Sequence, residues 1–299
     1  MISREFMGER PPAGGDEVRW VECPRDAWQS LPAPVALPAR RAFLVACGEA
    51  GVRALDAGSF VSPRAVPQLA DSAEMLRGLP LPPGTDVLAI VANDRGVERA
   101  LEVDDVRTLG LPLSLSAAFE RRNVGRTPEE TWVWLPGWVE RVRAAGRTPV
   151  VYVSMGFGNP DGEPWHTDAT AAAVARVRAA GVERVVVADA VGRARAVDVG
   201  EVLRACERPS ALGLHLHARP DGWRPLLEEA LDIGVRWIEG TFGGLGGCPF
   251  AGDALVGNLP SERVVPWLHA KGFVTGIDEG ALASLAREAG RLARSVTTR

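Results

Sequence analysis

Residues 182–217 read VERVVVADAVGRARAVDVGEVLRACERPSALGLHLH, with two short apolar runs on either side of a longer amphipathic one. Val182–Asp189 and Leu212–His217 are rich in valine and leucine, which is typical of strands buried on both faces. The stretch near Val197–Cys206 has the apolar spacing of a helix. Because parallel strands need a crossover connection of this length, the segment predicts one unit of a parallel sheet.

The same alternation gives eight strand-like segments along the chain. They are Val18–Cys23, Val52–Ala57, Asp86–Ala92, Val106–Leu111, Val150–Ser154, Val182–Asp189, Leu212–His217 and Val235–Glu239. Helical patterns follow near Pro38–Ala50, Val66–Arg77, Asp168–Ala180, Val197–Cys206 and Asp221–Ile233, and shorter ones open at Asp94 and at the capping sequence Thr127–Glu130. Two more helices fit after the last strand, near Ser261–Lys271 and Glu279–Arg294. The pattern predicts an α/β fold, a (β/α)8 TIM barrel with additional C-terminal helices.

An open, doubly wound sheet is the alternative fold. Dinucleotide-binding sheets of that kind carry Gly-x-Gly-x-x-Gly after the first strand, whereas Pro24-Arg25-Asp26 stands there in this chain. A barrel uses about 250 residues as one domain, and the chain has 299 residues. We therefore expect a flexible N-terminal lead-in at residues 1–17 and a single catalytic barrel domain with C-terminal helices at residues 18–299.

The composition excludes several classes of protein. Apolar residues make up 46% and charged residues 24%, with a net charge of −4, so we expect no nucleic-acid partner. No apolar run approaches the ~20 residues that span a bilayer, so we expect no membrane partner. The four cysteines form no CxxC pair, and residues 1–18 carry no secretory signal, which predicts a cytoplasmic protein with reduced thiols. Lys271 is the only lysine and lies in a polar segment, so carbonyl chemistry here would use a metal rather than an imine.

Polar residues stand where the predicted strands end. Because the carboxyl ends of barrel strands meet at one mouth, we expect a single site built from Arg25, Asp26, Asp56, Asn93, Asp189, His215 and His217. His215 and His217 share one face of a strand and could bind one metal ion together with an aspartate and an amide. Mg²⁺, Mn²⁺ and Zn²⁺ suit such ligands. A hydrogen-bonded pair of core histidines is the alternative.

The glycine-rich sequence Gly243–Phe250 contains Cys248, and Asn258 follows ten residues later. Glycines let a loop approach a ligand closely, and the thiol could then exchange a proton there. The alternatives are a tight turn with a bystander thiol and a turn asparagine after Gly257. Trp28 lies beside Arg25 and Asp26 and either shapes the pocket or closes the barrel mouth.

Several motifs together resemble the 3-hydroxy-3-methylglutaryl-CoA lyase family, within a wider group of barrel metal-dependent lyases and Claisen-type synthases. The matching motifs run from about Val18 to Gly276. They are Arg25-Asp26-x-x-Gln29, Ser59-Phe60-Val61-Ser62-Pro63, Tyr152-Val153-Ser154, His215-x-His217, and Gly244-Leu245-Gly246-Gly247-Cys248-Pro249 with Gly257-Asn258.

The resemblance implies a role for each matching position. Asp26, His215, His217 and Asn258 look like the ligands of a divalent metal, Mg²⁺ or Mn²⁺ rather than Zn²⁺. Arg25 looks like the residue that stabilises the enolate, and Cys248 looks like the proton donor. Asp56 stands where the family has glutamate, and Asp189 matches an aspartate near the metal; we expect both to be catalytic. We expect substrate contacts from Gln29, Trp28, Ser59, Asn93, Ser154 and Arg219.

The implied reaction is retro-Claisen or retro-aldol cleavage of a 3-hydroxyacyl-CoA to acetyl-CoA and a ketoacid. The resemblance also implies a homodimer. The sequence departs from the family pattern at Ala117, Ala190 and Ala218, and Ser30-Leu31-Pro32 lacks a lysine often found there. These departures keep an alternative open, a same-fold aldolase or Claisen-type condensing enzyme acting on a different oxoacid, with or without CoA. A catalytically silent barrel that serves as a scaffold is the third hypothesis.

Overall fold

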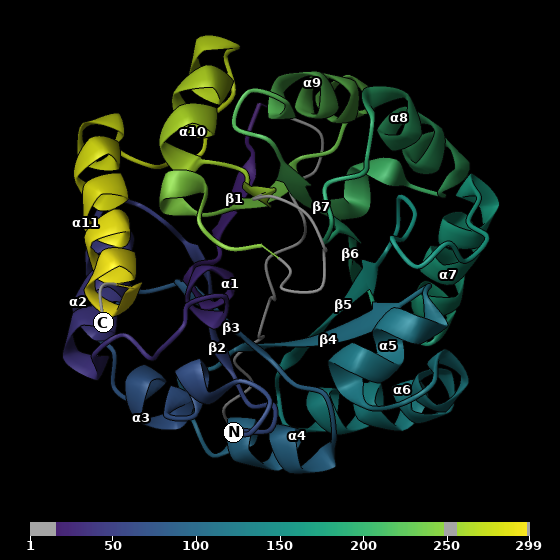
Figure 1. Cartoon of the computed structure of the whole chain (residues 1–299), viewed down its shortest axis with the longest axis horizontal. Helices are drawn as coiled ribbons and strands as arrows, with labels where there is room; N and C mark the ends of the chain where they lie inside the picture. The colour runs from purple at the N-terminus through teal and green to yellow at the C-terminus, as the bar shows by residue number, and fades with distance from the viewer. Residues whose placement is uncertain (1–15, 248–255, 298–299) are drawn as a thin grey trace, which may run out of the picture.

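A computed structural model describes residues 16–247 and 256–297. Eight parallel strands form its centre, and β1 pairs with both β2 and β8, so the sheet closes on itself (Figure 1). They are β1 (Arg19–Glu22), β2 (Ala54–Ser59), β3 (Asp86–Ile90), β4 (Thr108–Ser114), β5 (Thr148–Ser154), β6 (Arg184–Asp189), β7 (Leu212–Ala218) and β8 (Trp237–Gly240). The predicted TIM barrel is confirmed.

Helices surround the barrel between successive strands (Figure 1). They are α2 (Leu37–Glu49), α3 (Ser72–Leu76), α4 (Asp94–Leu101), α5 (Ala117–Val124), α6 (Pro128–Ala144), α7 (Thr167–Ala179), α8 (Ala196–Ala205) and α9 (Trp223–Ile233). The predicted C-terminal helices are α10 (Ser261–Ala270) and α11 (Glu279–Thr297), and α11 packs against α10 and α2. No helix in the described ranges is long and apolar enough to cross a membrane.

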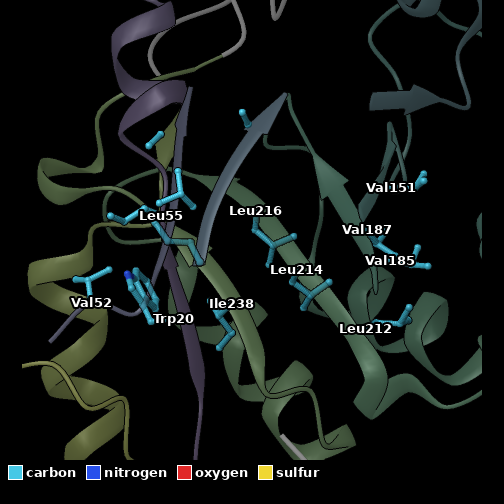
Figure 2. Packing of buried hydrophobic residues seen from close by; sticks show 14 of the residues in the cluster. Trp20, Val52, Leu55, Val151, Val185, Val187, Leu212, Leu214, Leu216 and Ile238 are labelled. Carbon is cyan, nitrogen blue, oxygen red and sulfur yellow. The ribbon is translucent and has the colours of Figure 1, made fainter. Parts of the chain in front are cut away.

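Side chains alternate between the two faces of the strands and form two apolar layers. Outward-facing residues such as Trp20, Leu55, Leu214 and Leu216 pack against the surrounding helices in one large core (Figure 2). Inward-facing residues form a smaller cluster inside the barrel, which includes Val21, Leu88, Val150, Val186 and Trp237. This alternation is the period-two pattern of a filled barrel.

A polar cluster occupies the end of the barrel where the strands begin. Asp86 accepts hydrogen bonds from Arg19 (2.6 Å), Arg184 (2.9 Å) and Thr108 (2.6 Å). Burial alone would raise the pKa of Asp86, but the two arginines hold it below its ordinary value. Because this cluster fills the end where the strands begin, the mouth of the barrel lies at the other end, where the strands finish.

One local prediction was wrong, one was confirmed, and one short helix was not predicted. The residues directly after the first strand form this helix, α1 (Pro24–Gln29), and Pro24 is favourable in its first turn. The expected helix at 66–77 is a 3-10 turn, Pro67–Leu69, followed by the short α3. It breaks because the Ser72 hydroxyl donates to Leu69 O and accepts from the Ser59 amide. The capping box that opens α6 is present, with Thr127 and Glu130 bonded reciprocally.

Candidate active site

Helix α1 carries Arg25 and Asp26 into the mouth directly after β1. The Arg25 Nε donates to both Asp56 carboxylate oxygens, at 3.2 and 3.0 Å, and its Nη2 donates to the same carboxylate. Its Nη1 donates to Asp26 Oδ1 (3.1 Å) and to Gln29 Oε1 (3.4 Å). Two carboxylates and an amide therefore fix the orientation of the guanidinium.

The two aspartates around Arg25 differ in their acidity. Burial raises the pKa of Asp56 to about 6, although Arg25 opposes the shift. Burial also acts on Asp26, but Arg25, His217 and His215 hold the pKa of Asp26 at about 2. Asp26 is thus an anion at any physiological pH.

The two histidines of β7 converge on Asp26. The His215 and His217 Nε2 atoms lie 3.1 Å apart, and His217 Nε2 lies 3.7 Å from Asp26 Oδ2. Burial, with His215 next to it, lowers the pKa of His217 to about 4, so His217 is a neutral imidazole. Burial would also lower the pKa of His215, but its hydrogen bond with Glu239 raises it.

Asn258 lies on a two-residue strand, β9 (Gly257–Asn258), which pairs antiparallel with β7 so that Asn258 faces His217. The interpretation of Asn258 as an isolated turn residue is therefore wrong. Its Nδ2 donates to Asp26 Oδ2 (2.6 Å) and Leu245 O (2.9 Å). Its Oδ1 is buried and has no hydrogen-bond partner in the described structure.

These residues fit a divalent metal ion. One ligand atom each from Asp26, His215 and His217 lies within 4.8 Å of the others. The partnerless Asn258 Oδ1 supplies a further oxygen beside Asp26, and a buried polar atom without a partner is costly unless a ligand or ion satisfies it. Carboxylate and amide oxygens and imidazole nitrogens are all common ligands of divalent metal ions.

The glycine-rich segment touches this group of residues. Gly246 has φ +99°, and a Cβ at that position would lie 2.5 Å from Asn258 Nδ2 and 2.9 Å from Asp26 Oδ2. Only glycine allows the backbone to pass so close to both side chains. Cys248 lies outside the described residues.

A cavity of about 380 Å³ opens in front of these residues. Arg25, Asp26, His215 and His217 line one side, and Gln29 and Ser154 also line it, as predicted for substrate contacts. Much of the remaining wall is apolar and includes Val61, Ile90, Phe119, Val124 and Ala190.

Three predicted substrate-contact residues do not line this cavity, and two of them have structural partners instead. Trp28 is buried against Phe43, with 6.2 Å between ring centroids, and Arg40 lies over its ring. Asn93 caps α4, where its Oδ1 accepts from the Gly96 amide (2.9 Å). Arg219 is exposed on the loop after β7.

Ser59 and Asp189 are likewise absent from the cavity lining, although both are buried. The Ser59 amide donates to Ser72 Oγ (3.0 Å), which holds the end of β2 against α3. The Asp189 carboxylate accepts from the amides of Val191 (3.2 Å) and Ala194 (2.7 Å) and so organises the loop after β6. The Asp189 side chain therefore has a structural role, whereas Ser59 makes its contact through the backbone.

Glu239 is a site residue that the sequence interpretation missed. It ends β8, is fully buried, and bonds to His215 Nδ1 at 2.9 Å. Its position near the carboxyl end of the eighth strand, directly before Gly240, could have identified it, because site residues of barrel enzymes lie at these strand ends. Tyr152, quoted only as part of a motif, donates to the same carboxylate (3.2 Å).

The fold and these residues define a barrel enzyme with a divalent-metal site at the carboxyl ends of its strands. The HMGL-like family model matches residues 17–288. The hydroxymethylglutaryl-CoA lyase of Pseudomonas mevalonii is 31% identical over 268 residues, which cover 88% of this chain and 87% of the relative. The (R)-citramalyl-CoA lyase of Chloroflexus aurantiacus is 35% identical over 277 residues, which cover 87% and 85%.

A solved structure agrees with these matches. An HMG-CoA lyase from Acinetobacter baumannii, in complex with coenzyme A and 3-methylmalate, has a TM-score of 0.86 and 28% identity, with 93% of this chain and 92% of that chain covered. The chain therefore belongs to the HMGL-like family and is a carbon–carbon lyase. Dependence on a divalent metal is typical of that family, and the cluster described above fits it.

Proposed function

We propose that this protein cleaves a 3-hydroxyacyl-CoA to acetyl-CoA and a ketoacid. The observation that carries the proposal is the convergence of Arg25, Asp26, His215 and His217 on one cavity. In this reaction the C2–C3 bond breaks, the C3 hydroxyl loses its proton and becomes a carbonyl, and the C2 carbanion gains a proton. Two groups in the site must therefore be stabilised, the alkoxide at C3 and the enolate at C2.

Asp26, His215, His217 and Asn258 are the proposed ligands of Mg²⁺ or Mn²⁺. When bound there, the ion supplies Lewis-acid polarisation of the C3 hydroxyl and lowers its pKa. Asp26 also lines the cavity and is the proposed acceptor of the hydroxyl proton once that hydroxyl has been made more acidic.

Arg25 is the proposed partner of the enolate oxygen. Its guanidinium lines the cavity, while the Asp56 carboxylate behind it is fully buried and fixes its direction. A charged donor that is already oriented towards developing negative charge stabilises the transition state more than a mobile one. Asp56 is proposed to act through Arg25.

Cys248 is the proposed proton donor to the C2 carbanion. The support is Gly246, two residues earlier, whose backbone lies against Asp26 and Asn258. A thiol can give its proton to a carbanion and then be reprotonated, which is the chemistry that this step requires. Gln29 and Ser154 are proposed to contact the substrate, since they line the cavity.

The cavity wall keeps a second candidate substrate class open. Val61, Ile90, Phe119 and Ala190 contribute apolar surface to a wall that also includes Gln68, Arg122 and Asn123. The apolar part of this lining is compatible with a different oxoacid, as in the aldolase or Claisen-type alternative.

The test incubates the protein, loaded with Mg²⁺ or Mn²⁺, with hydroxymethylglutaryl-CoA and with citramalyl-CoA, and measures acetyl-CoA by mass spectrometry. Metal-dependent release that is lost in Cys248→Ala and in His217→Ala supports the proposal. Bound metal without release from either thioester points to the alternative substrates. Absence of metal binding would overturn the proposed site.

We also propose a cytoplasmic location. The support is that Cys23, Cys47 and Cys206 are free, buried thiols. That the protein forms a homodimer stays a prediction. Light scattering on the purified protein tests it by measuring the molar mass in solution.

A further inference from the structure

The Glu239 carboxylate lies inside the barrel, directly beneath the proposed metal ligands. It is fully buried and is surrounded by four groups that can donate hydrogen bonds. Its partners are His215 Nδ1 (2.9 Å), Trp237 Nε1 (3.1 Å), the Tyr152 hydroxyl (3.2 Å) and the Cys23 thiol (3.7 Å). Glu239 does not line the cavity, so the arrangement is not explained by a contact with the substrate there.

The bond to Glu239 selects one tautomer of His215. A carboxylate can only accept, so in the neutral ring of His215 the proton lies on Nδ1 and Nε2 keeps the lone pair. His215 Nε2 points at His217 Nε2, 3.1 Å away, and so towards the group that includes Asp26. The lone pair is thus directed to where a metal ion would be held.

We propose that Glu239 is a positioning residue for the metal site, which holds the ring of His215 and its tautomer ready for ligation. The inference rests on the metal ligands of the proposed function but not on the reaction or the substrate. Carboxylates that accept from the second nitrogen of a ligating histidine raise metal affinity by fixing that ring.

Tyr152 and Trp237 fix Glu239 in turn. Trp237 donates from β8 itself, and Tyr152 donates from β5 across the barrel, while its ring also lines the cavity. The Tyr152 ring packs edge-on against His215, with 6.3 Å between centroids. The carboxylate cannot turn away from His215 without breaking these bonds.

Glu239→Gln is the informative change, because it keeps the shape of the side chain and replaces one acceptor oxygen by an N–H donor. An amide has two N–H donors, and each of the four partners of Glu239 described above is itself a donor or can act as one. An amide N–H facing His215 would be satisfied by the opposite tautomer, with the proton on Nε2. That tautomer cannot bind a metal through Nε2.

The matched control is Glu22→Gln. Glu22 is buried like Glu239 and lies on the neighbouring strand β1, but it bonds to Trp20, Phe242 and Ser261 rather than to a histidine. Mn²⁺ affinity is measured by electron paramagnetic resonance in the absence of substrate. We expect Glu239→Gln to raise the Kd by roughly 10- to 100-fold and Glu22→Gln to leave it within about twofold. A folded Glu239→Gln protein with wild-type Kd would overturn the proposal.

A second measurement needs no variant. The chain has four histidines, so ¹⁵N-histidine labelling of the metal-free wild-type protein gives few signals. At a pH where His215 is neutral, we expect the Nδ1-protonated tautomer at His215. Protonation on Nε2 would overturn the proposal even if Glu239→Gln failed to fold. Lyase activity enters neither measurement, so failure here is distinct from failure of the proposed reaction.

Discussion

The burial of Glu22 leads us to predict that the free energy of unfolding of this protein depends on pH in a specific way. Its side chain lies on the outer face of β1, where the carboxylate accepts from the Phe242 amide (2.6 Å), the Trp20 indole (3.3 Å) and the Ser261 hydroxyl. No cation is among these partners. Burial therefore raises the pKa of Glu22 from 4.5 to about 8, although the hydrogen bonds oppose the shift. Glu22→Gln mimics the neutral acid and removes this titration.

The size of the effect follows from the difference in pKa between the unfolded and folded chain. As pH rises, the Glu22 carboxyl loses its proton in the unfolded chain before it does so in the folded chain. The contribution of Glu22 to the free energy of unfolding is therefore fully present below pH 4.5 and is lost as pH rises through about 8. Each unit corresponds to about 1.36 kcal/mol, so the wild type loses about 4 kcal/mol between pH 5 and 9 that the variant keeps. With an unfolding entropy of about 0.6 kcal/mol/K for 299 residues, this is a difference of about 6 °C in Tm.

The assay is urea unfolding followed by the fluorescence of the nine tryptophans, at five pH values from 5 to 9. Only the difference between the two proteins matters, since other titrations cancel. Glu129→Gln, at an exposed position on α6, controls for a generic effect of the substitution. A difference between wild type and Glu22→Gln that stays constant from pH 5 to 9 would refute the reasoning.

Three further predictions concern the site and its surroundings. Arg25→Lys should lower kcat by roughly 10²–10³ with Mn²⁺ affinity little changed, because an ammonium cannot copy the fork that Asp56 orients; an unchanged kcat contradicts the role of Arg25. Asn93→Ala should cost about 1 kcal/mol in denaturant unfolding, with kcat and KM unchanged, since Asn93 caps α4; a raised KM would instead support substrate contact. Gly246→Ala should weaken Mn²⁺ binding in a titration, because its Cβ would displace Asn258; equal affinity would show that the backbone shifts freely.

The barrel was predictable because eight apolar segments alternate with helical ones, and the pattern depends on period alone. The strand ends pointed to Arg25, Asp26, His215 and His217, which the structure brings together. The pairing of strands that lie far apart in the sequence could not be predicted. Asn258 reaches the site only because β9 pairs with β7 across about forty residues of chain.

Local capping explains two of the residues that the structure does not bring to the cavity. Asn93 and Asp189 follow strands as site residues do, yet their carbonyl or carboxylate oxygens accept backbone amides of the next turn. Asparagine and aspartate are common both as helix or turn caps and as site residues. A position directly after a strand therefore cannot distinguish a capping residue from a site residue. Glu239 was missed for the opposite reason, because it acts from inside the barrel, through His215, and does not line the cavity.

The pairing of β9 with β7 has a consequence for how such a protein can diversify. Leu245 is tied to Asn258 and to Thr241, and Gly257 pairs with Ala218, so the two ends of the segment between them are fastened to the barrel rim. When the ends of a loop are already held together, doubling its length adds only about 0.6 kcal/mol of closure entropy. Insertions and exchanges between Gly247 and Gly257 therefore add little closure entropy and leave the proposed metal ligands Asn258 and His217 in register.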